Sequence, residues 1–146
     1  NDLNTVVSEA VTLFVDAHKD IQFEFRPAEG LPKFNLDAEQ INRVMVNLLD
    51  NAVASLNKQT GHIGVLIRYD EAHRRVVVAV ADDGVGVPAG YKRKVFDPYF
   101  STKKSGTGLG LAIVSSIISD HKGVITVSDN HPTGTIVSFQ LPVNEV

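Results

Sequence analysis

Two glycine-rich segments have the residue types that could bind a ligand through the backbone. The first is Asp82-Asp83-Gly84-Val85-Gly86, which follows an apolar run, and the second, further along the chain, is Gly106-Thr107-Gly108-Leu109-Gly110. A carboxylate at a strand end can accept a hydrogen bond from an exocyclic amine, and glycines allow a backbone to approach a ligand closely. Since the second segment opens an apolar helical run, its backbone N–H groups suit phosphate. The two segments together predict a nucleotide pocket.

A row of polar side chains on a predicted helix adds a candidate metal site. Asn47, Asn51 and Ser55 are spaced four residues apart, so they lie on one helix face beside an apolar stripe. Amide oxygens can hold a magnesium ion that takes its remaining ligands from water and phosphates. The alternative interpretation is a row of ordinary helix-surface residues, and for Lys58, just beyond, that is the preferred one.

The elements that position these residues follow from the apolar periodicity. Spacings of three and four predict a helix over 3–18, a long helix capped by Asp37 with Gln40 at the capping-box position, and a helix over 108–121. Alternating apolar residues predict strands over 21–25, 62–70, 75–82, 123–129 and 134–141. Because hairpin-like strand pairs begin and end this order, we predict an α+β fold. It would be a two-layer sandwich with a mixed, mostly antiparallel sheet and helices packed on one face, rather than a parallel doubly wound fold.

Composition excludes several functional classes. The 146 residues are 43% hydrophobic, which suits one soluble domain, and the formal net charge of -3 gives no electrostatic footprint for nucleic acid. The sequence has no cysteine, so disulfides and cysteine zinc sites are excluded. No apolar run approaches the length of a membrane span. Because the sequence begins with Asn1 rather than methionine, we expect it to be part of a longer protein.

Two other glycine motifs compete with this interpretation. Gly84-Val85-Gly86-Val87-Pro88-Ala89 nominally fits the dinucleotide-binding fingerprint, which requires a helix to start at once. Pro88 and Gly90 argue against that helix, and the charges of Asp82 and Asp83 would repel a pyrophosphate. The second glycine segment lacks the lysine of a phosphate-binding P-loop, so the sequence excludes that family as well.

Five motifs occur in a characteristic order along the chain. They are Asn47-Leu48-Leu49-Asp50-Asn51-Ala52, Asp82 to Gly86, Phe96-Asp97-Pro98-Tyr99-Phe100-Ser101-Thr102-Lys103, Gly106 to Gly110, and Gly134-Thr135. In this order they resemble the N box, first glycine box, F box, second glycine box and closing motif of the ATP-binding catalytic domain of sensor histidine kinases. These kinases belong to the superfamily of gyrase, the Hsp90 chaperone and MutL. The resemblance covers essentially residues 1–146 and implies the Bergerat-type ATP-binding fold.

The resemblance extends to one subgroup and shows one departure. The run from Phe96 through His121 is most similar to the nitrogen-regulation sensor kinases. Asp83 stands where relatives often have asparagine, and it adds a negative charge near the mouth of the pocket.

The resemblance also implies roles for individual residues. Asp82 would accept a hydrogen bond from the adenine amino group, with Thr135 bonding through water nearby. Asn51 would ligate magnesium, and Asn47 would orient the ion or its water. The residues implied to contact the cofactor, Mg-ATP, are Asn47, Asn51, Ser55, Asp82, Gly84, Gly86, Gly106, Thr107, Gly108, Leu109, Gly110 and Thr135.

A lysine pair and a lid are implied near the phosphates. Lys103 or Lys104 could stabilise charge on the transferred phosphoryl group, so these lysines and Asn47 are the implied catalytic residues. The competing interpretation of the lysines is a solvated loop. Residues 87–107 would form the ATP lid.

The phosphoacceptor signature of the family, a histidine followed by an acidic residue and a proline in a helix, is missing. All five histidines fail this test: His18, His62, His73, His121 and His131. We therefore expect the chain to donate the γ-phosphate to a histidine on a separate dimerisation helical domain, and not to phosphorylate itself. The phosphate would then pass to a response regulator.

The resemblance implies partners and a location as well. The isolated chain would be monomeric and would contact neither nucleic acid nor membrane. We expect a cytoplasmic domain, and anchoring of the parent kinase in the inner membrane stays open.

Three alternatives have to be weighed against this prediction. An ATP hydrolase like gyrase or MutL is disfavoured because Asn47 stands where those proteins have a glutamate base. A serine kinase acting as an anti-sigma factor has a similar length, but the run from Phe96 to Lys103 argues against it. A degenerate module that only binds a partner protein is the third, and the intact motifs argue against it.

Overall fold

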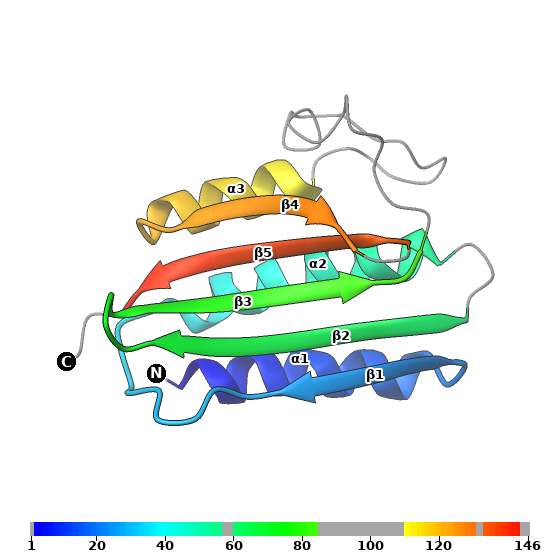
Figure 1. Ribbon diagram of the computed structural model, residues 1–146, viewed down its shortest axis with the longest axis horizontal. Helices are drawn as coiled ribbons and strands as arrows, with labels where there is room; N and C mark the ends of the chain where they lie inside the picture. The colour runs from blue at the N-terminus through cyan, green and yellow to red at the C-terminus, as the bar shows by residue number, and fades with distance from the viewer. Residues whose placement is uncertain (1, 57–59, 85–109, 131–132, 144–146) are drawn as a thin grey trace.

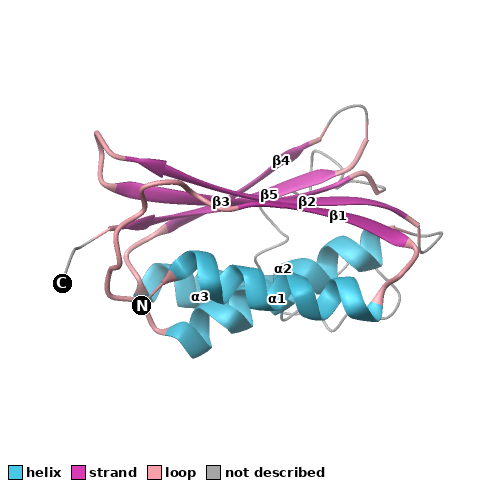
Figure 2. Cartoon of the chain, turned by 90° about the horizontal axis from the view of Figure 1, so that it is seen from below, coloured by secondary structure: helices cyan, strands magenta, loops and turns pink. Residues whose placement is uncertain are grey.

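The fold consists of a sheet layer and a helix layer. The chain is described by a computed structural model over residues 2–56, 60–84, 110–130 and 133–143. In this described part, a five-stranded sheet lies beside three helices (Figure 1). All three helices cover the same face of the sheet, as the edge-on view shows (Figure 2). The predicted two-layer α+β architecture is thereby confirmed.

Two of the described helices begin at an aspartate N-cap, and the sequence predicted one of these caps, Asp37. Helix α1 spans Leu3–Ala17, α2 spans Ala38–Ser55 and α3 spans Gly110–Asp120. The carboxylate of Asp2 accepts a hydrogen bond from the backbone N–H of Thr5 at 3.4 Å, and that of Asp37 accepts from Gln40 at 3.1 Å. Each aspartate thus satisfies an N–H that has no partner inside the helix. None of the described helices is long and apolar enough to span a bilayer.

The N-terminus of α2 differs in one respect from the predicted capping box. In a capping box, the Gln40 side chain would accept a hydrogen bond from the backbone N–H of Asp37. That N–H instead donates to Nε2 of His121 at 3.1 Å, while Nδ1 of His121 lies 2.9 Å from the carbonyl oxygen of Ile117. Because a carbonyl oxygen only accepts, Nδ1 donates to Ile117, and Nε2 accepts from Asp37. His121 therefore joins the end of α3 to the start of α2.

The sheet is mixed and mostly antiparallel, as predicted. Its strand order is β1-β2-β3-β5-β4, with β1 parallel to β2 and every other neighbouring pair antiparallel. The strands are β1 (Ile21–Arg26), β2 (Gly61–Asp70), β3 (Arg75–Asp82), β4 (Val124–Asp129) and β5 (Thr135–Pro142). β2 and β3 form a hairpin whose turn ends at Arg74, with a φ of 50°.

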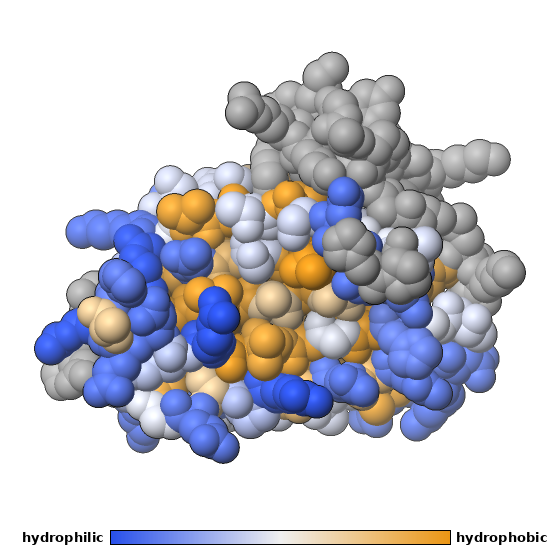
Figure 3. Space-filling model, viewed as in Figure 1, coloured by the Kyte–Doolittle hydropathy of each residue, from blue (hydrophilic) through white to orange (hydrophobic). Residues whose placement is uncertain are grey.

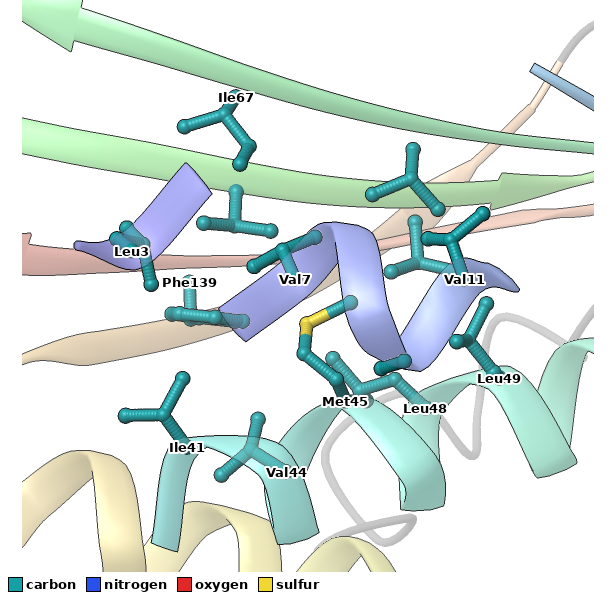
Figure 4. Close-up of a cluster of buried hydrophobic side chains, with 14 of the residues drawn as sticks. Leu3, Val7, Val11, Ile41, Val44, Met45, Leu48, Leu49, Ile67 and Phe139 are labelled. Atoms are coloured by element: carbon teal, nitrogen blue, oxygen red, sulfur yellow. The ribbon is translucent and has the colours of Figure 1, made fainter. Parts of the chain in front are cut away.

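The hydrophobic core lies between the sheet and the helices. Helix α2 contacts α1, α3 and β3, so it is fixed from several sides. Burial of each of its large apolar side chains contributes about 1.5–3 kcal/mol. This packing fixes the helix that carries the polar row of the predicted site. The residues at the centre of this core include Leu3, Val7 and Val11 of α1, Ile41, Val44, Met45, Leu48 and Leu49 of α2, and Ile67 and Phe139 of the sheet (Figure 4).

Candidate functional site

Asp82 and Thr135 form a buried polar pair at the end of the sheet. Asp82 is the last residue of β3 and Thr135 the first of β5, and the register places them directly opposite each other. Their exposed fractions are 5% and 6%, in a sheet whose other buried positions are apolar. The backbone N–H of Gly84 donates to Oδ1 of Asp82 at 2.9 Å, which fixes the carboxylate at the strand end.

The hydroxyl of Thr135 has an unmet hydrogen-bonding requirement. Its Oγ1 is buried and has no hydrogen-bond partner among the described residues. A buried polar atom without a partner costs about 1–3 kcal/mol, and such atoms are rare in native proteins. The atom is adjacent in register to a buried carboxylate. The pair therefore suits a ligand, or a ligand with its water, that can both donate to Asp82 and bond to Thr135.

Close backbone contacts on two sides hold the strand end that carries Asp82. A Cβ on Gly84 would collide with the carbonyl oxygen of Ser55, at the end of α2. A Cβ on Gly134, which has a φ of +108°, would collide with the carbonyl oxygen of Asp82. Gly84 and Gly134 are therefore required by packing within the protein itself, in addition to any approach to a ligand.

Asp83 faces a different neighbour from Asp82. Its Oδ1 accepts from the backbone N–H of His62 at 3.0 Å, and its Oδ2 lies 3.1 Å from Nδ1 of the same residue. The backbone hydrogen bond from His62 is the main cause that lowers the pKa of the Asp83 carboxyl below its ordinary value, and the bond to the His62 ring adds to it. The negative charge expected near the pocket mouth is thus engaged with the start of β2.

The predicted polar row lies on α2, beside the strand end. Nδ2 of Asn47 donates to the carbonyl oxygen of Arg43 at 2.9 Å, so its Oδ1 is the atom available to a cation. Asn51 is partly buried, one turn later. The Ser55 hydroxyl donates to the carbonyl oxygen of Asn51 at 3.0 Å, so its proton is used inside the helix and only its lone pairs are available to a ligand.

The donor set on α2 fits magnesium but no all-protein metal cage. Among the described residues, no group of three or more histidine, aspartate or glutamate side chains could hold a metal ion. Two amide oxygens one helical turn apart suit an ion that takes its other ligands from water and phosphates.

Much of the predicted phosphate region lies outside the described residues. Gly110 is the first described residue of α3. The predicted site residues outside the described ranges are Gly86, Lys103, Lys104, Gly106, Thr107, Gly108 and Leu109, together with the predicted lid over 87–107.

Sequence reasoning missed two residues of this site. Nδ2 of Asn130 donates to the carbonyl oxygen of Asp82 at 2.9 Å, and the Thr133 hydroxyl donates to that of Asp83 at 3.1 Å. Asparagine is common in turns, so the residue type of Asn130 does not indicate a role in a site. No local signal connects it with a strand end 48 positions earlier in the chain.

Comparison with known families identifies the class of the protein. A family model described as "Histidine kinase-, DNA gyrase B-, and HSP90-like ATPase" matches residues 36–145, and the chain therefore belongs to this family. Sensor histidine kinase ZraS of Escherichia coli (strain K12) is 34% identical over 145 residues, which cover 98% of this chain and 30% of ZraS. Sensory histidine kinase/phosphatase NtrB of Rhodobacter capsulatus is 39% identical over 138 residues, which cover 87% of this chain and 38% of NtrB.

Comparison with solved structures indicates which member class of this family the chain resembles. The catalytic domain of histidine kinase ThkA superimposes with a TM-score of 0.86 at 32% identity, covering 98% of this chain and 93% of that chain. ThkA in complex with response regulator protein TrrA gives a TM-score of 0.81 at 27% identity, covering 99% of this chain and 41% of that chain. Within its family, the chain is thus a histidine kinase catalytic domain, as its motifs predicted. It spans about a third of the length of the curated relatives ZraS and NtrB.

Proposed function

We propose that this chain binds Mg-ATP and donates the γ-phosphate to a histidine on a separate dimerisation helical domain, as the catalytic part of a two-component sensor kinase. Its membership of the ATPase family and its similarity to sensor histidine kinases support the proposal. The similarity to ThkA, which has been solved with a response regulator, supports a regulator as the downstream phosphate acceptor.

The buried pair of Asp82 and Thr135 is the observation that carries the proposal. The Asp82 carboxylate, fixed by the N–H of Gly84, would accept a hydrogen bond from the exocyclic amine of adenine. Guanine presents a carbonyl oxygen at that position, so the carboxylate would repel it and the pocket would select adenine. The buried Oγ1 of Thr135 would gain its missing partner from water or from the base.

Magnesium and the phosphates would lie along α2 and at the start of α3. Asn51 would supply an amide oxygen to the ion, and Asn47 would ligate it or orient its water through Oδ1. When bound, the ion would neutralise charge on the phosphate oxygens. Backbone N–H groups near Gly110 would bind the phosphates. The same role is proposed for Gly106, Thr107, Gly108 and Leu109, and Ser55 would accept a hydrogen bond from the cofactor's water.

The acceptor imidazole would come from a different domain. Three of the histidines already have hydrogen-bond partners within the fold: His62 with Asp83, His73 with Asp70, and His121 with two backbone groups.

Lys103 or Lys104 would stabilise charge on the phosphoryl group during transfer. The ATP-binding domain would contribute orientation and charge stabilisation, and the partner helix would contribute the nucleophile.

Phosphate transfer can be tested with ATP labelled at its γ-phosphate. We expect no label on the chain alone, and acid-labile label on a separately prepared helical domain of the parent kinase when both are mixed. Asn51→Asp is expected to alter the magnesium dependence of labelling, whereas Asp50→Asn, at an exposed neighbouring position, leaves it unchanged. Label on the chain itself would contradict the proposal, and label on a partner's serine would favour the anti-sigma-type kinase.

A further inference from the structure

The segment between β4 and β5 is bonded to the end of β3 at several points. Nδ2 of Asn130 donates to the carbonyl oxygen of Asp82 at 2.9 Å. The hydroxyl of Thr133 donates to the carbonyl oxygen of Asp83 at 3.1 Å. Gly134 packs so closely on the carbonyl oxygen of Asp82 that no side chain fits at that position. A sequence-distant segment thus holds the backbone of both aspartates.

Asn130 bonds to the backbone beside both members of the buried pair. Its side chain bonds the backbone of Asp82, and its backbone N–H donates to the carbonyl oxygen of Gly134 at 3.1 Å. Gly134 directly precedes Thr135. The same residue therefore fixes the peptide that carries the carboxylate and the peptide next to the buried hydroxyl.

The chemistry of this contact is specific to an amide donor. A carbonyl oxygen accepts only, so the side chain of Asn130 must present its NH₂ group to Asp82. Aspartate at this position would have nearly the same shape but no donor, and its lone pairs would face the Asp82 oxygen. Alanine would remove the contact without adding charge.

We propose that Asn130 is a positioning residue that sets the adenine selectivity of the site by holding Asp82 in register with Thr135. The proposal rests on the proposed function, because it concerns the same pocket. A bond to the base edge requires the carboxylate to lie within a few tenths of an ångström of its productive position. A shift of the Asp82 peptide would weaken recognition of the exocyclic amine and leave phosphate and magnesium contacts on α2 and α3 in place.

Titration with two nucleotides that differ at the base edge separates this role from a general structural one. Inosine triphosphate has the same phosphates and sugar as ATP, but carries an oxygen where ATP has the amine. Wild-type chain is expected to prefer ATP. In Asn130→Asp and Asn130→Ala that preference should fall by about tenfold, the usual effect of losing one well-placed hydrogen bond to a charged group, while the affinity for inosine triphosphate changes little.

The control variant lies on the strand that precedes this segment. Ser128→Ala, at an exposed position of β4, should retain the full preference for ATP. Thermal unfolding establishes that each variant is folded, and the nearly isosteric Asn130→Asp is decisive if Asn130→Ala does not fold.

Three results would overturn the inference in distinguishable ways. Equal loss of affinity for both nucleotides in a folded Asn130 variant would make the residue structural only. Full retention of the ATP preference in such a variant would remove Asn130 from adenine recognition while leaving the proposed function intact. Failure of the wild-type chain to bind ATP would overturn the proposed function, and this inference with it.

Discussion

At the residue scale, the adjacent aspartates at the end of β3 have the same chemistry and different surroundings. Asp82 is 5% exposed and opposite Thr135, whereas Asp83 bonds the backbone and ring of His62. The sequence predicted Asp82 as the adenine acceptor from its place in the motif. It could not predict the partner of Asp83, because His62 is 21 positions away and the contact depends on the pairing of β2 with β3.

Asp83 is expected to give the fold an acid-sensitive contribution to stability. Its folded-state pKa is lowered below 3.8, chiefly by the backbone N–H of His62. A carboxyl with a depressed pKa stabilises the fold above its unfolded-state pKa, and this stabilisation is lost as the pH falls through the folded-state pKa. The free energies of unfolding of the wild type and Asp83→Asn, measured with denaturant, should therefore differ by a constant amount above pH 3.8 and converge below it. Asp50→Asn serves as the exposed control, and a difference that grows on acidification would contradict the assignment.

Gly134 is expected to be intolerant of any side chain. It combines a φ of +108° with close contact to the Asp82 carbonyl oxygen, so Gly134→Ala should lower the free energy of unfolding by about 1–3 kcal/mol or more. Gly64→Ala is the matched control, because nothing lies within 4 Å of a Cβ there, and its effect should stay within about 0.5 kcal/mol. Urea unfolding measures both. Equal effects of the two substitutions would show that the close contact has no energetic weight.

At the element scale, local periodicity predicted each of the described helices and strands but not which elements lie next to one another in the fold. The predicted helix over 3–18 is observed as Leu3–Ala17, and the predicted strands over 62–70 and 75–82 as Gly61–Asp70 and Arg75–Asp82. The cap by Asp37 is confirmed. The reciprocal half of the capping box is wrong, because the ring of His121, which directly follows α3 and is 84 positions away, accepts from the Asp37 N–H.

His121 is expected to stabilise the junction between α2 and α3. His121→Ala removes the acceptor for the Asp37 N–H and the donor for the Ile117 carbonyl oxygen, so it should cost about 1–2 kcal/mol of unfolding free energy. His73→Ala is the matched control, since His73 bonds Asp70 at an exposed turn and its side chain is 76% exposed. Its substitution should leave the unfolding free energy nearly unchanged. A His121→Ala variant as stable as the wild type would contradict the interhelical role.

At the scale of the whole molecule, the site forms where separate parts of the fold meet. The end of β3, the start of β5, the last turns of α2 and the segment after β4 converge there, as the packing of Gly84 and Gly134 shows. The sequence predicted the fold class because amphipathic periodicity and hairpins are local signals. Strand order and the contact of Asn130 depend on pairings between distant segments, for which one sequence has no local signal.

In the described part of the molecule, no helix covers the second face of the sheet. Apolar side chains gather near the centre of this face of the sheet (Figure 3). The exposed large hydrophobic residues Leu66 and Val124 belong to β2 and β4. The candidate nucleotide site lies at the strand ends rather than on this face.

Calorimetric titration of wild type and Asp82→Asn with ATP, ADP and GTP, with and without magnesium, tests the central claim most directly. We expect adenine-selective, magnesium-enhanced binding in the wild type. Asp82→Asn should weaken ATP binding by about 10- to 100-fold, the range for a lost charge-assisted hydrogen bond. Asp83→Asn, which changes the neighbouring carboxylate, should stay within a few-fold of the wild type. Wild-type affinity in a folded Asp82→Asn variant would contradict the pocket assignment, and absence of binding in the wild type would favour a module that only binds a partner protein.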